Sequence, residues 1–277
     1  MRISFALTLA LLATPAVAQT HLAVCDAKHK RIMLYDATTG ALINKDFIVN
    51  AGTTFSLDRP REVLAVGPEL WILDQGADAI FRFSLTGNWL ATLQVVDNPR
   101  GGVVIGNTVH VTNSGTANAA PGPAVMQFNT AGMITSNFAT ANATPYDVVP
   151  FMGDLLVSDI SNAADVIQRY SLTGTYLGPW SVTGIPNFNP QQLQIGQNGN
   201  VFCASASGSP GIYEFDANTG NQVNGWTLSP GGAGLYQLPN GDWMYGSNAG
   251  IFIFNPASQS VVDVSPTDGA EGHGITG

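Results

Sequence analysis

A short segment recurs along the chain, and most copies carry a polar residue at its second position. The four clearest copies begin at Pro60, Pro99, Pro145 and Pro190, and looser counterparts begin at Gly232 and Gly272. The second positions of the six copies are Arg61, Arg100, Tyr146, Gln191, Ala233 and His273. If the copies surround a common axis, five hydrogen-bonding side chains converge on one mouth.

Such a ring is suited to a carboxylate, a phosphate or a sugar acid. Arg61 and Arg100 can each donate paired hydrogen bonds to the oxygens of an anion. Tyr146 and His273 could supply or accept a proton. The third position of three copies adds two carboxylates and an amide, from Glu62, Asp147 and Gln192. These residue types predict a binding site for a small anionic ligand, with an acid and a base at hand.

The same residues also permit a purely structural interpretation. Polar side chains at the start of strands often bond to one another or to buried water. Glu62 or Asp147 could simply neutralise the two arginines. Ligand binding, catalysis and internal hydrogen bonding therefore all stay open for this ring.

The elements that must position the ring repeat about every 45 residues. Each copy contains an apolar run that closes on an aromatic residue, at Tyr35, Phe83, Phe128, Tyr170, Phe215 and Phe254. The intervals between these aromatics are 48, 45, 42, 45 and 39 residues. Glycine-containing turns follow five of them, and the runs are short and rich in Val, Ile, Phe and Tyr. This pattern predicts about four β-strands in each copy.

Six repeats of four strands predict an all-β chain folded as a six-bladed β-propeller with four antiparallel strands per blade. The chain enters with the second strand of a blade, at His21 to Asp26, and lacks the first. The missing strand is expected at the other end of the chain, in residues 272–275. We therefore expect the C-terminal strand to join the N-terminal blade and close the ring, which removes open sheet edges.

Two further patterns concern the second strands. The second strands of four copies end in a hydrogen-bond acceptor, at Asp26, Asp74, Asn113 and Asp159. Ala204 and Gly246 stand at the matching places of the last two copies. We expect the acceptors to cap turns.

Cys25 and Cys203 align at the same second-strand position of blades one and five. Because these blades are separated by blade six, the cysteines should lie beyond the roughly 7 Å that a disulfide spans. Two buried free thiols are predicted.

The first eighteen residues have the features of a signal peptide. Arg2 is followed by an apolar run at 3–12 and by Ala16-Val17-Ala18, a small-residue cleavage site. The sequence thus predicts a signal peptide at 1–18, a propeller at 19–277, and a secreted or periplasmic protein without a membrane span.

The formal charge is −9 with 10% charged residues, which argues against nucleic acid as a partner. No spaced metal-ligand motif, P-loop or nucleophile elbow occurs, so no metal and no cofactor are expected.

The segment 60–67, followed by 70–74 and 80–87, resembles the six-bladed propellers of the NHL-repeat, senescence-marker/gluconolactonase-like and TolB-like proteins. The resemblance covers the whole expected mature chain and implies the fold. Lactonase-type members hold a divalent metal with Glu, Asn and Asp. Glu62 and Asp147 match this set, but Gln192 and glycines stand where further ligands are expected.

Peptidylglycine lyase members of the same group bind zinc with three histidines and carry Arg and Tyr at the mouth. Arg61, Arg100 and Tyr146 match the second part of that pattern, but the zinc histidines are missing.

The sequence as a whole predicts an exported, non-catalytic propeller that binds a small anionic ligand or a protein partner. The expected location is the channel mouth on the face with the long connections, at 50–59, 112–125, 160–166, 181–189 and 229–234. The alternative is a lactonase-like hydrolase or lyase that acts on a small acidic or sugar-acid molecule. In that case Arg61 and Arg100 would clamp the anion, and Tyr146 or His273 would move the proton. A third possibility is a structural component of an envelope or matrix.

Overall fold

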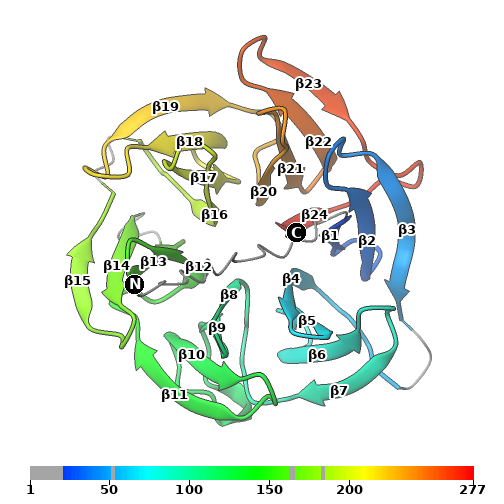
Figure 1. Cartoon of the computed structure of the whole chain (residues 1–277), viewed down its shortest axis with the longest axis vertical. Helices are drawn as coiled ribbons and strands as arrows, with labels where there is room; N and C mark the ends of the chain where they lie inside the picture. Colours follow the sequence, from blue (N-terminus) through cyan, green and yellow to red (C-terminus); the bar gives the residue numbers. More distant parts are fainter. Residues whose placement is uncertain (1–20, 51–53, 162–165, 182–184) are drawn as a thin grey trace, which may run out of the picture.

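The computed structural model describes residues 21–50, 54–161, 166–181 and 185–277. These residues form six four-stranded antiparallel sheets arranged around one axis, as Figure 1 shows. The predicted six-bladed β-propeller is therefore confirmed. The predicted signal peptide, residues 1–18, lies outside the described residues.

Each blade is a row of four strands that runs from the axis outward. Blade 1 contains β24 (Gly272–Thr276), β1 (His21–Asp26), β2 (Arg31–Asp36) and β3 (Leu42–Val49). Blade 2 contains β4 (Pro60–Val66), β5 (Glu69–Asp74), β6 (Ala79–Ser84) and β7 (Trp89–Leu93). Blade 3 contains β8 (Gly102–Ile105), β9 (Thr108–Asn113), β10 (Ala124–Asn129) and β11 (Ile134–Ala139), with a short 3₁₀ helix, η1 (Ala117–Ala119), before β10.

The other three blades follow the same order. Blade 4 contains β12 (Pro145–Phe151), β13 (Asp154–Asp159), β14 (Ile167–Ser171) and β15 (Tyr176–Pro179). Blade 5 contains β16 (Pro190–Ile195), β17 (Val201–Ser205), β18 (Gly211–Phe215) and β19 (Gln222–Thr227). Blade 6 contains β20 (Gly234–Gln237), β21 (Trp243–Ser247), β22 (Gly250–Asn255) and β23 (Ser260–Asp263). In the described part of the chain, no helix is long and apolar enough to cross a membrane.

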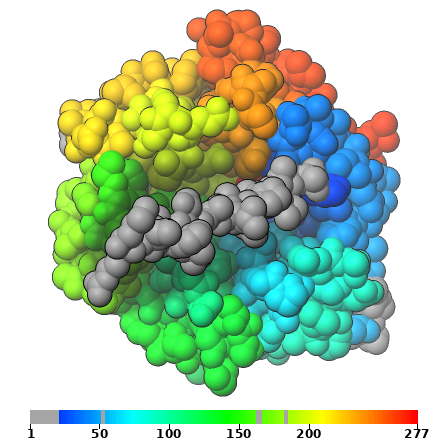
Figure 2. All heavy atoms as spheres, in the orientation of Figure 1, coloured from blue at the N-terminus to red at the C-terminus, as the bar shows by residue number. Residues whose placement is uncertain are grey.

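The ring closes through the two ends of the chain, as predicted. Strand β24 pairs antiparallel with β1, with Val24 opposite Ile275 and Asp26 opposite Gly272. In the space-filling view of Figure 2, the blue N-terminal strands lie beside the red and orange C-terminal blade. The first and last strands of the chain thus share one sheet, in which β24 covers the inner edge of β1.

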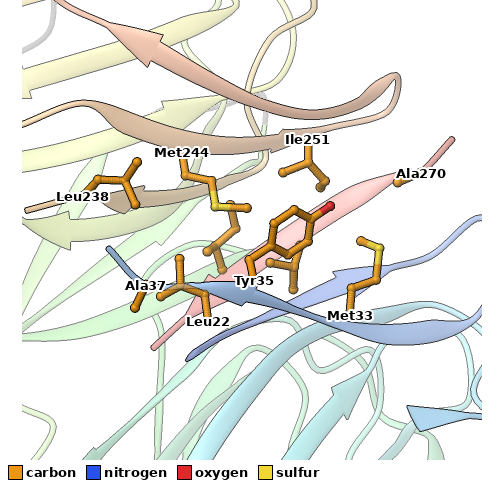
Figure 3. Packing of buried hydrophobic residues seen from close by; sticks show 10 residues of the cluster. Leu22, Met33, Tyr35, Ala37, Leu238, Met244, Ile251 and Ala270 are labelled. Carbon is orange, nitrogen blue, oxygen red and sulfur yellow. The ribbon is translucent and has the colours of Figure 1, made fainter. Parts of the chain in front are cut away.

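The core lies between neighbouring blades. Figure 3 shows this for blades 1 and 6, where Leu22, Met33 and Tyr35 face Met244 and Ile251. The six aromatics that mark the repeat are each at most 1% exposed, and each fills the space beside an adjacent sheet. Burial of one such side chain stabilises the fold by about 2 to 3 kcal/mol. The sequence repeat therefore corresponds to a repeated contact between sheets.

Glycines allow the inner strands to approach the axis closely. A Cβ atom on Gly101 would collide with the carbonyl oxygen of Tyr146, and one on Gly274 would collide with that of Arg61. The same holds for Gly234 and the carbonyl oxygen of His273. Ring residues of one blade thus pack against a glycine of another blade, and this contact draws their side chains together.

The strand register corrects one detail of the repeat. Pro190 lies opposite Ser205, as Pro60 lies opposite Asp74, so the last acceptors are Ser205 and Ser247 and not Ala204 and Gly246. Serine has a hydroxyl where the earlier copies have a carboxylate or an amide, so the sequence alone did not reveal the equivalence.

The corrected register also changes the alignment of the two cysteines. Cys25 is one residue before its strand end and Cys203 is two, so the two cysteines do not occupy the same position. Both are nevertheless buried free thiols, as predicted.

Candidate functional site

All six ring positions line one pocket of about 320 Å³ at the mouth of the channel. The sequence-predicted Arg61, Arg100, Tyr146, Gln191 and His273 are thus brought together with Ala233. The other lining residues are Gln75, Ile160, Ala206, Ser207, Gly231, Asn248 and Glu271. Ile160 and Gly231 belong to long connections, so the pocket opens on the face where the sequence predicted it.

The acceptors at the ends of the second strands hold this ring in place. In four blades the acceptor binds the backbone N–H two residues before the ring residue, and this fixes the start of the inner strand. The pairs are Asp26 with Glu271 (3.0 Å), Asp74 with Arg59 (2.9 Å), Asp159 with Thr144 (3.1 Å) and Ser205 with Asn189 (3.3 Å). These residues therefore do more than cap their own turns: they position the residues of the mouth.

Three predicted site residues, Glu62, Asp147 and Gln192, do not line the pocket. Each side chain accepts a hydrogen bond from a backbone N–H of the inner strand of a neighbouring blade. The bonds are Gly102 N to Glu62 Oε2 (3.0 Å), Leu193 N to Asp147 Oδ2 (2.8 Å) and Leu235 N to Gln192 Oε1 (2.7 Å). We call these three residues the floor. They join neighbouring blades, and their acceptor atoms are already engaged.

The floor carries two carboxyl groups with unusual acidity. Burial raises the pKa of Asp147 to about 7. Burial, and after it the charge of Asp147, raises the pKa of Glu62 well above its usual range. Neither carboxyl group forms an ion pair with Arg61 or Arg100 among the residues described. The neutralisation considered from the sequence is therefore not seen.

Arg61 and Arg100 instead have neutral partners. Arg61 donates from Nε to Gln75 Oε1 at 2.5 Å, and its Nη1 lies 2.6 Å from Nδ1 and 2.5 Å from Nε2 of His273. Arg100 donates to the hydroxyl of Ser114 at 3.2 Å, and its guanidinium carbon lies 5.8 Å from the centre of the Tyr146 ring. Arg100 is only 8% exposed, and burial lowers its pKa.

Two buried polar atoms at the mouth have no partner in the described part of the chain: the hydroxyl of Tyr146 and Oε1 of Gln191. The amide nitrogen of Gln191 donates to Asn189 Oδ1 at 3.0 Å, which leaves its oxygen as the free end. Buried polar groups are nearly always hydrogen-bonded, so these two atoms are available to bond to a molecule in the pocket. The mouth thus offers two cations, one hydroxyl and one free acceptor.

His273 and Glu271 form a pair at the rim of the pocket. Nε2 of His273 lies 3.1 Å from Glu271 Oε1. Burial lowers the pKa of His273 to about 4, so its imidazole is neutral at neutral pH and donates Nε2–H to the carboxylate. This hydrogen bond in turn lowers the pKa of Glu271. The carboxylate of Glu271 is therefore ionised.

Sequence reasoning missed Gln75, Ile160, Ala206 and Asn248, which form part of the pocket wall. Each directly follows the acceptor at the end of a second strand. This rule holds in blades 5 and 6 only when Ser205 and Ser247 are taken as the acceptors. The missing information was the register of β17 and β21, which the sequence pattern did not reveal.

The metal site implied by the lactonase resemblance does not fit these residues. Its two matching carboxylates, Glu62 and Asp147, are bound to backbone N–H groups and do not line the pocket. Over the ranges that the structure describes, no group of three or more His, Cys, Asp or Glu side chains is placed to hold a metal ion.

Comparison with known proteins supports the fold. No protein-family model and no curated protein matches the sequence. The structure is similar to a chain of the nidogen/laminin complex, with a TM-score of 0.70, 15% identity, and 92% of this chain and 97% of that chain covered. It is also similar to a streptogramin B lyase, with a TM-score of 0.62, 16% identity, and coverage of 92% and 82%.

A third similar structure is a putative 6-phosphogluconolactonase from Bacteroides uniformis, with a TM-score of 0.60, 17% identity, and coverage of 90% and 84%. The predicted resemblance to six-bladed propellers is thus confirmed for the fold. Identities this low carry no function from any of these proteins to this chain.

Proposed function

We propose that this chain is an exported propeller that binds a small anionic ligand at the mouth of its channel without transforming it. The observation that carries the proposal is the pair of arginines, Arg61 and Arg100, which line one pocket and have no ion pair among the described residues. A buried cation without a counter-charge destabilises a fold. A bound anion would supply that charge.

The rest of the pocket supports the same ligand class. Guanidinium groups donate paired hydrogen bonds to carboxylate or phosphate oxygens. The free hydroxyl of Tyr146 and the free oxygen of Gln191 would meet polar groups next to the anionic one. Ile160 and Ala233 provide apolar wall. Export is supported by the features of residues 1–18 alone.

Calorimetric titration of the purified protein with succinamate, a small carboxylate that also carries an amide, tests the proposal. We expect binding by the wild type and a loss of at least about 30-fold in affinity when Arg61 and Arg100 are both changed to Met, because two charge-assisted contacts are removed. Arg82→Met is the matched control, since Arg82 pairs with Glu69 outside this pocket.

Two results would contradict anion binding at the mouth. The first is an absence of binding to any small carboxylate or phosphate. The second is binding that persists unchanged in the double arginine variant.

A second function, a hydrolase or lyase, is favoured by one observation. Tyr146 has an unpaired hydroxyl and lies with its ring under the guanidinium of Arg100, and a neutral His273 is held by Glu271 at the same mouth. Together these groups could clamp an acidic substrate and move a proton. Turnover in a screen of lactones and esters, lost in Tyr146→Phe with folding intact, would establish this function. Binding without turnover would leave the first proposal in place.

A further inference from the structure

We propose that Glu271 makes the mouth selective for monoanions over dianions. This inference rests on the proposed function, because it names the charge of the ligand that the same pocket accepts. It assigns Glu271 a role in specificity, distinct from the role of the arginines in affinity.

The charges that line the pocket are few. Arg61 and Arg100 are the two cations, and Glu271 is the one carboxylate among the lining residues described. His273 adds no charge at neutral pH. Among the lining side chains, the two cations and the one carboxylate leave a net charge of +1, which one negative charge balances. Outside the lining, Arg59 acts on Glu271 and Asp159 acts on Arg100, and these two charges have opposite signs. A dianion would leave an excess negative charge in the pocket.

Glu271 is fixed from two sides, so its charge does not move away when a ligand enters. Its backbone N–H donates to Asp26 Oδ1 at 3.0 Å, and Asp26 is fully buried. Its carboxylate accepts Nε2–H of His273 at 3.1 Å, and the side chain is 37% exposed. A fixed charge at this depth is only partly screened by solvent.

The carboxylate also lies close to the place where an anion would bind. Only the imidazole of His273 separates Glu271 from the guanidinium of Arg61, through contacts of 3.1 Å and 2.6 Å. This spacing is within the distance of about 8 to 10 Å over which charges interact at ordinary ionic strength. A second negative charge on the ligand therefore meets repulsion from Glu271, which we expect to reduce affinity about 10-fold.

The substitution Glu271→Gln isolates this charge from the hydrogen bond. The amide oxygen of glutamine can still accept Nε2–H of His273, so the imidazole keeps its place. A purely structural role for Glu271 would thus be preserved in this variant, whereas a role in charge selection would be lost.

The experiment compares two probes of nearly equal size, succinamate with one negative charge and succinate with two. We expect the wild type to bind succinamate about 10-fold more tightly than succinate at neutral pH, and Glu271→Gln to lose or reverse that preference. Inorganic phosphate, mostly a dianion under mildly alkaline conditions, should gain affinity in the variant as succinate does. Asp242→Asn is the matched control, since Asp242 is an acidic residue that does not line this pocket.

The outcomes separate this inference from the proposed function. If neither these probes nor any other small carboxylate or phosphate binds, the proposed anion site itself fails. If both bind with equal affinity in the wild type, or if the wild type prefers succinate, anion binding stands and the selectivity is overturned. If the preference persists in a folded Glu271→Gln protein, selectivity stands and the role of Glu271 is overturned. The comparison in the wild type needs no variant, so it remains decisive even if Glu271→Gln fails to fold.

Discussion

Two buried arginines of this propeller have opposite surroundings. Arg31, with a side chain only 4% exposed, contacts three carboxylates, those of Asp26, Asp46 and Asp268, at 2.8 to 2.9 Å. We call this group the clasp. Arg100 is 8% exposed at the mouth, and its side chain donates to the hydroxyl of Ser114. The same residue type is neutralised inside the chain in one place and left without an anion in the other.

The pKa values of Arg31 and Arg100 shift in opposite directions, in keeping with these surroundings. Burial alone would lower the pKa of Arg31, but its hydrogen bonds to Asp268 and Asp46 outweigh burial and raise that pKa. At Arg100 burial prevails and the pKa is lowered. The clasp thus stabilises the fold by internal charge pairing. At the mouth, Arg100 retains the cost of burial without an ion pair, and a bound anion would relieve that cost.

The clasp also lies where the ring closes. It joins β2 and β3 to residue 268, just before β24, and β24 brings His273 to the mouth. Asp26 belongs to both regions, because it accepts from Arg31 Nε and from the backbone N–H of Glu271. Closure of the ring and construction of the mouth therefore share one buried carboxylate.

Removal of the clasp arginine should have the largest effect on stability. Arg31→Met removes the buried cation beside Asp26 and leaves His29 as the one remaining ionisable group in contact with that carboxylate among the described residues. We expect the free energy of unfolding to fall by about 4 to 5 kcal/mol. Urea unfolding measures this change. Lys30→Met is the control, because Lys30 pairs with Asp58 in an exposed position and should contribute less than about 1 kcal/mol. A loss no greater than that of the control would remove the distinction between clasp and mouth.

The floor beneath the mouth should produce the next largest effect, visible as a pH dependence. The pKa of Asp147 is raised to about 7 from an ordinary value of 3.8, so the folded state keeps a proton that the unfolded chain loses. The contribution of Asp147 to the free energy of unfolding is therefore fully present below about pH 4 and is lost as the pH rises toward 7. Relative to the wild type, Asp147→Asn should gain about 3 to 4 kcal/mol across that window.

Stability measured by urea unfolding at several pH values checks the prediction for Asp147. Asp216→Asn is a suitable control, because hydrogen bonds from Thr219 lower the pKa of this exposed carboxyl and confine its effect to acid below the window. A difference between wild type and Asp147→Asn that does not change with pH would show that Asp147 carries no raised pKa.

His273 should give a smaller pH dependence of the opposite sign. Its pKa is lowered to about 4 from 6.5, so the unfolded chain binds a proton that the folded state refuses. Stability is thus lost as pH falls from about 6.5 to about 4, by about 2 to 3 kcal/mol. His273→Gln should remove this loss, so the variant should become more stable relative to the wild type as the pH falls. If His273→Gln instead becomes less stable relative to the wild type as the pH falls, the imidazole of the wild type must be charged at the mouth.

The fold was predictable because the same local pattern occurs six times. An apolar run that closes on an aromatic, followed by a glycine turn, marks one contact between sheets, and repetition makes a weak pattern strong. The ring position was predictable for a related reason: Pro60, Pro99, Pro145 and Pro190 mark one place in the inner strand, which brings Arg61 and Arg100 to one mouth.

The rest of the site depended on contacts that a linear pattern does not contain. Glu62, Asp147 and Gln192 alternate with the ring residues along their strands, so they belong to the floor, and only the neighbouring blade's N–H groups reveal their use. Glu271 and Gln75 lie outside the inner strands and reach the mouth because Asp26 and Asp74 end their strands beside it. Register and closure, rather than residue type, decide these positions.

The smallest predicted effect on stability decides between a ligand site and a purely structural ring. Arg100→Met removes a buried charge and its hydrogen bond to Ser114, and replaces them with an apolar chain beside Tyr146. If the mouth awaits an external anion, the unliganded variant should be as stable as the wild type or more stable by up to about 1 kcal/mol in urea unfolding. No buried charge is left unpaired, and the Ser114 hydroxyl keeps its own hydrogen bond to the carbonyl oxygen of Asn98. If the ring is structural, the same substitution should destabilise the fold by more than about 1 kcal/mol. That result would place Arg100 with Arg31 and remove the contrast between mouth and clasp on which the proposed function depends.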